Sequence, residues 1–445
     1  MARKYLVETF GCQMNAHDGE RIAGLLEADG FQPTGRETDA DLIVINTCSV
    51  RERAEDKLYT RLGEIRAAGV ETGRRPMVAV TGCVAQQEGE KLLKRDPSID
   101  VIVGTQALKQ LPGLVHAAEE NSVPRVDVRP YDDVSFPMGI AKSSDPSRAW
   151  VSIIEGCNEF CSFCVVPYTR GHERMRPVAD ILAEVRRAAD TGRVEIQLLG
   201  QIVNHYQAPD DPGCDFAGLL ERVSDVEGIR RIRFTSPHPR HATDRLIAAM
   251  RDLSKVCKHF HLPIQSGSNA VLKAMRRRYT REEYLQLVAR LREEVPGISL
   301  STDMIVGFPG ETEGDFEDTM DLVRQAQYSF MYSFKYSPRP NTLAIKRMAD
   351  DVLESDKTRR IMALQALQAR IQLALFQSQV GRVVEVLVES KSRRRDHELA
   401  GRTDGWILVN FAGPAEWVGR FMSVRISGAA PNSLRGEVVE GPYAH

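Results

Sequence analysis

No hydrophobic run in this 445-residue chain approaches the ~20 residues that a membrane-spanning helix needs. The N-terminal stretch MARKYLVETFGC passes from two basic residues directly into a strand-like run, without the apolar core and cleavage site of a secretion signal. The net charge is only −2, so no overall positive field indicates a nucleic-acid partner. We therefore expect a cytoplasmic protein with no membrane partner, in which any contact with RNA depends on local basic patches.

The eight cysteines lack the pattern of a secreted disulfide framework, because six of them form two groups of three. Cys157, Cys161 and Cys164 lie within the ten residues EGCNEFCSFC. Three thiolates at this spacing can each bind a different iron of a cubane cluster and leave the fourth iron open for chemistry. A structural zinc site would need a fourth ligand nearby. His172 is the nearest histidine, so zinc stays open as an alternative.

The second group of cysteines follows three successive strands of a predicted parallel sheet. Residues 3 to about 104 alternate strand-like and helical patterns, which is typical of a sheet covered by helices. Cys12, Cys48 and Cys83 follow the first three strands, 36 and 35 residues apart. The carboxyl ends of neighbouring parallel strands lie at one edge, where such sheets bind ligands. We therefore predict a second three-cysteine cluster with its own open iron; three buried structural cysteines are the alternative.

The chain length predicts two or three domains. We place them at residues 1–120, 148–378 and 379–445, with a linker at 121–147. Five prolines between residues 105 and 147 indicate a connector without long elements.

From residue 150 the strand–helix alternation returns. The expected strands lie near 150–155, 194–199, 229–235, 258–263, 298–306 and 329–336, and the expected helices near 178–190, 215–226, 241–253, 281–294 and 313–326. Six such units are too few for an eightfold barrel, so we predict an open partial barrel whose catalytic face is at the carboxyl ends of its strands.

The last 100 residues change character twice. Residues 347–378 are rich in helix formers and predict a long helical bridge. Beyond Gly381 short alternating strands predict a small antiparallel barrel, a fold that often binds RNA. Its first turn carries basic residues, and three aromatic side chains are either stacking faces for bases or part of the barrel core. These residues are Lys391, Arg393, Arg394 and Arg395, and Trp406, Phe411 and Trp417.

One stretch is strongly basic. Residues 228–284 contain thirteen Lys and Arg against four Asp and Glu, including the run Arg276, Arg277 and Arg278. A surface that binds phosphates is one interpretation, and a solvated helix face is the other.

The spacing CxxxCxxC at Cys157 resembles that of the radical S-adenosylmethionine (radical SAM) enzymes, in which SAM binds the open iron and is cleaved to a 5′-deoxyadenosyl radical. Two triads, a partial barrel and a small barrel in this order resemble the methylthiotransferase family over essentially the whole chain. The motifs of its N-terminal domain are TFGCQMN (9–15), INTCSVRERA (45–54) and VTGCVAQQ (80–87), and the C-terminal part resembles a TRAM domain.

Seven further motifs are similar to the branch of that family that acts on tRNA. They are CSFCVVPYTRGHE (161–173), LLGQ-VN-Y (198–206), RFTSPHP (233–239), HLPIQSGS (261–268), MRRRYTREEY (275–284), TDMIVGFPGETE (302–313) and FKYSPRP (334–340). The resemblance implies conversion of N6-isopentenyladenosine at position 37 of tRNA to its 2-methylthio form, with one SAM as methyl donor and a second as radical source. It also implies two 4Fe-4S clusters, the tRNA anticodon loop, an external electron donor and a sulfur source as partners, and a monomer.

The same resemblance assigns site residues. Cys157, Cys161 and Cys164 would hold the SAM-cleaving cluster, and Cys12, Cys48 and Cys83 the auxiliary one. The candidates for SAM contacts are Gly200, Gln201, Ser236, Gly307, Gly310 and Glu311. The candidates for substrate contacts are Arg233, Gln265, Arg276, Arg277, Arg278 and Arg394. Three alternatives remain: a methylthiotransferase for an aspartate of ribosomal protein S12, one for threonylcarbamoyladenosine in tRNA, and a non-catalytic iron–sulfur protein that binds RNA.

Overall fold

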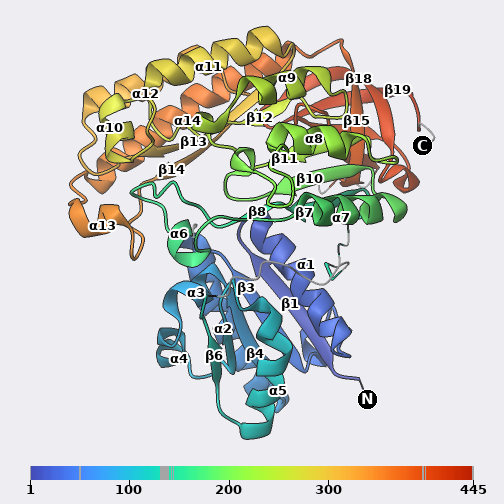
Figure 1. Ribbon diagram of the computed structural model, residues 1–445, viewed down its shortest axis with the longest axis vertical. Helices are drawn as coiled ribbons and strands as arrows, with labels where there is room; N and C mark the ends of the chain where they lie inside the picture. The colour runs from blue at the N-terminus through green and yellow to red at the C-terminus, as the bar shows by residue number, and fades with distance from the viewer. Residues whose placement is uncertain are drawn as a thin grey trace.

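The computed structural model describes residues 2–49, 52–130, 140–141, 143, 145–392, 395 and 397–442, and for residues 52–55 the backbone alone. Figure 1 shows three parts: a blue N-terminal sheet with helices on both faces, a central set of strands flanked by helices, and a red C-terminal barrel. The expected α/β multidomain class is therefore confirmed. Among the described helices, none combines the length and apolar composition needed to cross a bilayer.

The N-terminal sheet has six parallel strands in the order β2-β1-β3-β4-β5-β6. They are β1 (Lys4–Phe10), β2 (Gln32–Pro33), β3 (Leu42–Thr47), β4 (Met77–Gly82), β5 (Val101–Val103) and β6 (Arg125–Asp127), and the helices are α1 (Gln13–Ala28), α2 (Glu52–Thr72), α3 (Cys83–Glu88), α4 (Lys91–Arg95) and α5 (Leu111–Asn121). Every residue of β3, LIVINT, is buried. Successive side chains of β3 pack alternately with α1 and α5 on one face and with α2, α3 and α4 on the other.

The connector expected after residue 105 was wrong for its first half. Helix α5 and strand β6 lie there, and β6 pairs with β5 to extend the sheet. Pro112 lies in the first turn of α5, where a missing N–H costs no helical hydrogen bond. The domain boundaries themselves stay a prediction.

The central part is an open partial barrel of six parallel strands. They are β7 (Arg148–Ser152), β10 (Glu195–Leu199), β11 (Arg231–Phe234), β12 (His259–His261), β13 (Ser299–Val306) and β14 (Phe330–Lys335). The first three form one sheet and the last three another, and a parallel bridge between Ile232 and Val256 joins them in chain order. Two short strands, β8 (Ile154–Glu155) and β9 (Arg174–Met175), follow β7. The predicted partial barrel is confirmed.

The central part has helices that cover the outside of the strands and two short helices, the first at Val166 and the second at Leu343, that lie at loops (Figure 1). They are α6 (Val166–Thr169), α7 (Val178–Asp190), α8 (Phe216–Ser224), α9 (Asp244–Asp252), α10 (Asn269–Ala274), α11 (Arg281–Glu294), α12 (Glu313–Ala326), α13 (Leu343–Arg347) and α14 (Glu354–Gln377). Alternate residues of each strand, such as Leu300, Met304 and Val306 of β13, pack in the helix-facing core. Asp303 and Ile305 therefore face the interior of the barrel.

Two features of the C-terminal part differ from expectation. Helix α14 begins at Glu354 rather than near residue 347. Asp350 lies in the non-helical segment before the helix and accepts hydrogen bonds from Lys357 in the first turn of α14. The barrel contains β15 (Val383–Lys391), β16 (Glu398–Arg402), β17 (Leu408–Ala412), β18 (Phe421–Ala430) and β19 (Ser433–Glu440), and is closed in the order β15-β16-β17-β19-β18. The alternating segments that predicted the barrel are RVVEVLVES, WILVNF, FMSVRI and GEVVE, and they do not include β16. The β17–β19 pair is parallel in an otherwise antiparallel barrel.

The two outer domains contact opposite ends of the central strands. The C-terminal barrel contacts the amino ends, where Glu385 pairs with Arg231 and Glu389 with Arg148. The N-terminal domain contacts the loops at the carboxyl ends, where Arg21 pairs with Glu155. The N-terminal domain therefore lies beside the predicted catalytic face.

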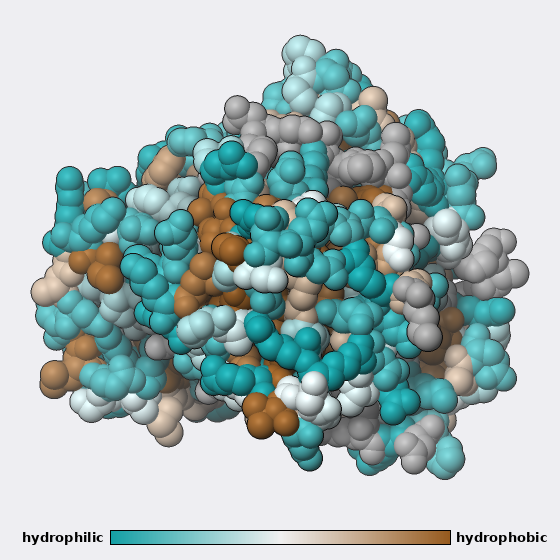
Figure 2. All heavy atoms as spheres, turned by 90° about the horizontal axis from the view of Figure 1, so that it is seen from below, coloured by the Kyte–Doolittle hydropathy of each residue, from teal (hydrophilic) through white to brown (hydrophobic). Residues whose placement is uncertain are grey.

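Seen from below, the molecular surface is mostly hydrophilic, with hydrophobic residues in short stretches between polar ones (Figure 2).

Candidate active site

The first cysteine triad lies in a loop that other segments hold at the carboxyl edge of the barrel. Cys157 N–H donates to the carbonyl of Gly171 (3.1 Å), and Ser162 Oγ donates to the carbonyl of Ala274 (2.8 Å). The loop begins with Gly156, whose φ is +84°, and a Cβ there would lie 2.0 Å from the carbonyl oxygen of His172. Only glycine fits such a position. The loop is therefore shaped by contacts with distant segments as well as by its own sequence.

Arg277 contacts the triad directly. Its Nη1 donates to Cys161 Sγ (3.3 Å), its Nη2 to the carbonyl of Pro263 (2.7 Å) and its Nε to Tyr279 (2.8 Å). The side chain is buried, whereas its neighbours Arg276 and Arg278 are exposed. Arg277 was predicted as a substrate contact on an exposed basic run; its side chain turns inward to a cysteine instead of lying exposed, and its contact with substrate stays a prediction. Arg276 and Arg278 remain accessible to phosphate.

Burial dominates the acidity of this triad in the absence of metal. Desolvation raises the pKa of Cys157 to about 12 and that of Cys164 to about 12, because a thiolate loses its hydration there. A bound cation reverses this, since metal coordination deprotonates thiols. The site therefore favours neutral thiols unless a metal or cluster is present.

The second triad is assembled from three strand ends, as the sequence predicts. Asn15, three residues after Cys12, donates to Asn46 Oδ1 (3.1 Å), two residues before Cys48, and accepts from Cys12 Sγ (3.2 Å). Gly82, directly before Cys83, has φ +90°, and a Cβ there would lie 2.5 Å from Asn46 Oδ1. The residues adjoining the three cysteines therefore contact one another. Asn15 and Asn46 were not assigned a role from the sequence, although both lie in the quoted motifs.

The three thiols of the second triad also interact. Hydrogen bonding with Cys48 lowers the pKa of Cys12 to about 6 and that of Cys83 to about 7, against the opposing effect of burial. The same bonds raise the pKa of Cys48. Cys48 is thus within hydrogen-bonding reach of both partners, and the triad converges on one point.

The first triad suits a multi-iron cluster better than a single ion. A tetrahedral zinc with ~2.3 Å Zn–S bonds places its sulfurs about 3.8 Å apart. Among the described residues, the only set of three potential ligands within 4.8 Å of one another is Glu159, His238 and His241, so the first triad is not that compact. His172, the fourth ligand considered for zinc, is exposed and hydrogen-bonded to Asn158. Four-iron clusters separate their thiolates further, because each binds a different iron.

The compact Glu159, His238 and His241 set does not have the features of a cation site. His238 Nδ1 accepts the Arg240 backbone N–H (3.3 Å), which leaves the ring proton on Nε2 and removes the lone pair that a metal needs. Burial and then the Arg277 charge lower the pKa of His238 to about 2, so the ring is neutral. His241 donates to Glu159 (2.8 Å), which also pairs with Arg240. These contacts hold the cysteine loop instead.

The residues predicted to contact SAM lie around the first triad, but several are occupied by internal contacts. Gln201 Oε1 accepts the backbone N–H of Gly156, so it fixes the cysteine loop. A Cβ at Gly200 would lie 2.3 Å from Ile154, which requires glycine there. Ser236 lies two residues after the end of β11 and has φ +60°. The three positions sit where the barrel strands meet the loop.

The second group of predicted SAM residues points toward helix α14. Glu311 is buried and accepts from Arg360 Nη1 (2.8 Å), and Gly310 N–H donates to Asp351 (2.7 Å). A Cβ at Gly307 would lie 2.3 Å from the Lys357 side chain. The side chain of Glu311 and the N–H of Gly310 are therefore used within the fold, and this turn anchors α14.

The predicted substrate residues separate in space. Arg233 donates to Glu195 (2.9 Å) and to the carbonyls of Thr403 and Asp404, so it joins the barrel to the C-terminal domain away from the triads. Its guanidinium is therefore used within the fold, and its role as a substrate contact stays a prediction. Gln265 is buried with φ +79° beside β13. Arg394 lies outside the described residues.

Two aromatic residues that the sequence did not single out face the barrel interior. Tyr332 and Phe334 alternate on strand β14 with Ser333 and Lys335, which bond to α14 on the outside. Their exposed fractions are 49% and 41%, high for large side chains on an inward face. The Tyr332 ring lies 6.0 Å from that of His261 in edge-to-face geometry. The signal in the sequence was the alternation FMYSFK.

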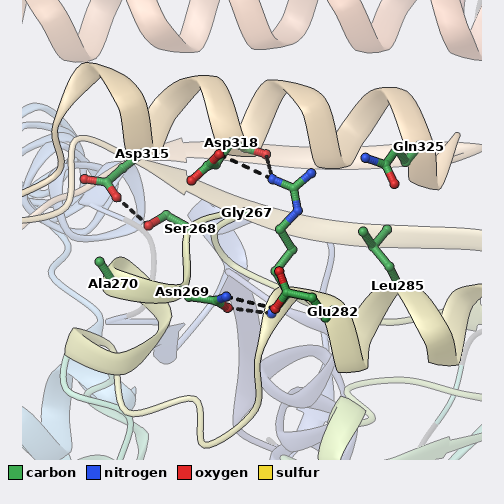
Figure 3. A pocket seen from close by; sticks show the side chains of 10 residues that line it. Gly267, Ser268, Asn269, Ala270, Glu282, Leu285, Asp315, Asp318 and Gln325 are labelled. Carbon is green, nitrogen blue, oxygen red and sulfur yellow. Dashed lines mark hydrogen bonds and ion pairs between the residues drawn. The ribbon is translucent and has the colours of Figure 1, made fainter.

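A pocket of about 540 Å³ lies elsewhere, between α10, α11 and α12 (Figure 3). Its polar side chains satisfy one another: Ser268 donates to Asp315, and Arg281 pairs with Asp318. It is on the outer, helical side of the strands, and none of the six triad cysteines lines it.

Family models match three parts of the chain: the radical SAM superfamily at residues 151–323, the uncharacterized protein family UPF0004 at 4–104, and the TRAM domain at 377–439. A protein of Thiobacillus denitrificans named tRNA-2-methylthio-N(6)-dimethylallyladenosine synthase is 46% identical over 441 residues, covering 98% of both chains. A protein of the same name from Methylococcus capsulatus is 45% identical over 451 residues, covering 99% of this chain and 96% of that one.

Among solved structures, the radical S-adenosylmethionine methyltransferase TsrM from Kitasatospora setae, with cobalamin and a [4Fe-4S] cluster bound, matches with a TM-score of 0.56. The match covers 77% of each chain at 16% identity. At that identity the likeness shows the fold alone.

Proposed function

The chain belongs to the family of tRNA-2-methylthio-N(6)-dimethylallyladenosine synthases, and from this membership we propose that it converts N6-isopentenyladenosine at position 37 of tRNA to 2-methylthio-N6-isopentenyladenosine. The observation that carries the proposal is the approach of the two cysteine triads. Helix α3, which begins at Cys83, packs against α6, which follows Cys164 by two residues. A radical site and a sulfur-bearing site must share one cavity if carbon and sulfur are to be joined.

The three-thiol loop would hold the cluster that binds SAM. When bound, that cluster and SAM together supply a carbon radical able to remove hydrogen from an unactivated aromatic C–H. The chain's own part is to position the reactants. Arg277 holds Cys161 and orders the loop with Tyr279, and Gln201 fixes its first residue through the Gly156 N–H.

The second cluster of the proposal is held by Cys12, Cys48 and Cys83. Its support is the convergence of three thiols at a sheet edge that faces the first loop, with glycine and asparagine residues packed too closely for any larger side chain. A cluster held by these three cysteines would supply the sulfur for the product, and one SAM would supply the methyl group. An external reductant and a sulfur source complete the cycle, and the chain acts as a monomer in the cytoplasm, where its tRNA substrate is.

The substrate base must leave the anticodon stack to reach an interior site. Tyr332 and Phe334 offer accessible aromatic faces on β14, which is the last strand of the open barrel and lies at the edge of its sheet among the described strands. Base–aromatic stacking suits an adenine that is approached from its C2 edge. The TRAM barrel and the exposed Arg276 and Arg278 provide contacts for the rest of the RNA.

The test is anaerobic reconstitution with iron and sulfide, iron counting, and mass spectrometry of tRNA nucleosides after incubation with SAM and a reductant. We expect about eight irons per chain and the 2-methylthio product. About eight irons without modified tRNA would move the substrate to ribosomal protein S12 or to threonylcarbamoyladenosine. About four irons would remove the second cluster and the sulfur transfer that depends on it.

A further inference from the structure

One short segment, residues 169–171, connects the two cysteine triads. The carbonyl of Gly171 accepts the Cys157 N–H (3.1 Å) in the first triad's loop. Toward the N-terminal domain, the carbonyl of Thr169 accepts from Thr105 Oγ1, and that of Arg170 from Gln106 Nε2 (2.9 Å). A Cβ at Gly171 would lie 2.4 Å from Gln106 Nε2. The backbone of this segment is therefore fixed against both domains.

The side chain of Arg170 crosses the same interface. Its Nη2 donates to Asp18 Oδ2 (2.6 Å), and the exposed fractions of the two side chains are only 6% and 3%. A second ion pair beside it joins Arg21 to Glu155 (2.7 Å). Buried ion pairs add little net stability when compared with apolar residues of the same size. A role in function would explain the charge better than stability does.

The Arg170 charge acts on the auxiliary triad. Asp18 lies in α1, whose N-cap is Cys12, and α3, whose first residue is Cys83, packs against the helix that Arg170 terminates. Burial opposes the guanidinium charge, but Asp18, Cys83 and Cys12, in that order, raise the pKa of Arg170. Arg170 lies 2.6 Å from Asp18, whereas Arg21 lies 2.7 Å from Glu155 and 3.8 Å from Asp18, so the two buried arginines share the Asp18 carboxylate at different distances.

We propose that Arg170 sets the reduction potential of the auxiliary cluster, as a buried positive charge that favours its reduced, more negative state. The inference rests on the proposed second cluster. Reduction adds one electron to a cluster whose thiolates already carry negative charge, and a nearby cation in a low-dielectric interface lowers the energy of that state. Asp18, the anion of the same pair, opposes the effect, so the pair holds the potential at an intermediate value. Arg170 is a positioning residue and touches no reacting atom.

The test measures the potential of each cluster separately. A Cys157→Ala/Cys161→Ala/Cys164→Ala background keeps only the auxiliary cluster, and a Cys12→Ala/Cys48→Ala/Cys83→Ala background keeps only the SAM-cleaving one. Arg170→Gln, Asp18→Asn and Arg21→Gln are introduced into both, and EPR-monitored redox titration gives each midpoint. Arg21→Gln is the matched control, because it removes a buried arginine from the same interface.

We expect Arg170→Gln to shift the midpoint potential of the auxiliary cluster by at least about 59 mV to more negative values. For a one-electron couple this shift lowers the ratio of reduced to oxidised cluster tenfold at a fixed potential. Asp18→Asn should shift it in the opposite direction, and Arg170→Lys should restore most of the original value. The SAM-cleaving cluster should change less in every case. The proposal would be overturned if Arg170→Gln and Asp18→Asn shifted the potential in the same direction, or if Arg21→Gln shifted it as much as Arg170→Gln. Either result would show a general disturbance of the interface. Absence of iron from the first background would instead refute the second cluster itself.

Discussion

The two cysteine triads differ in how the fold assembles them. Cys157, Cys161 and Cys164 lie on one loop and converge because of local spacing. Cys12, Cys48 and Cys83 are 36 and 35 residues apart and meet only after three parallel strands have paired in register. A local site depends on its loop and the residues that hold it, whereas a non-local site depends on the whole sheet. Variants should therefore affect the two triads unequally.

The largest contrast is expected from removing one cysteine of each triad. Cys161→Ala should abolish both 5′-deoxyadenosine formation and methylthiolation, because the open iron that binds SAM is lost. Cys48→Ala should retain reductive SAM cleavage and make no 2-methylthio product. Both are measured by chromatography of 5′-deoxyadenosine and mass spectrometry of nucleosides. Methylthiolated RNA from Cys48→Ala would remove the sulfur-carrying role of the N-terminal triad.

A change beside the second triad sharpens the comparison. Gly82→Ala adds a Cβ that would lie 2.4 Å from the Thr47 carbonyl oxygen, at a residue whose φ is +90°. The ends of β3 and β4 must then separate, so reconstituted iron should fall from about eight to about four per chain. Gly73→Ala is the matched control, since its φ is also positive (+67°) and no atom lies within 4 Å of its added Cβ. Equal iron in the wild type and Gly82→Ala would mean that this packing does not support the cluster.

The aromatic pair on β14 gives a smaller, graded effect. Tyr332→Ala and Phe334→Ala should each weaken binding of tRNA that carries the isopentenyl group by about 5- to 150-fold, corresponding to ~1–3 kcal/mol for one stacked base. Iron content and SAM cleavage should be unchanged. Fluorescence anisotropy measures the binding, with Met362→Ala on exposed α14 as control. Unchanged affinity in both aromatic variants would exclude them from the substrate site.

The elements that the sequence predicted well are those whose pattern has a single explanation. The run LIVINT is short, rich in β-branched residues and followed by a helical pattern, which favours a buried strand covered by helices, and the structure has it fully buried. Strand β6 was missed because the prolines around it suggested a connector. Strand β16 was missed because it contains Gly401, which the fold requires: a Cβ there would lie 2.3 Å from the Leu387 carbonyl oxygen.

The sequence predicts those parts of the candidate site that depend on the spacing of residues along the chain or on the order of strands. It does not predict the parts that depend on the direction of a side chain. Both triads follow from spacing. The ion pair of Glu311 with Arg360 and the contacts of Arg233 with the C-terminal barrel join segments far apart in the chain, so no local pattern contains them. Arg170, in the quoted motif VVPYTRGHE, was visible as a residue but not as the partner of Asp18.

The run Arg276, Arg277 and Arg278 illustrates the same limit and carries the smallest predicted effect. The φ angles of Arg276 and Arg278 are both +59°, so the backbone alternates and sends the middle side chain to Cys161 while its neighbours stay exposed. If both exposed arginines contact phosphates, the double variant Arg276→Gln/Arg278→Gln should reduce the slope of log affinity against log salt by about 1.4, at ~0.7 per single-strand phosphate. Arg324→Gln/Arg370→Gln, on the exposed faces of α12 and α14, removes the same charge as a control. A slope equal to that of the control would show that the two exposed arginines face solvent and bind no phosphate. The variant Arg277→Gln should leave the slope unchanged and should alter the EPR signal of the SAM-cleaving cluster.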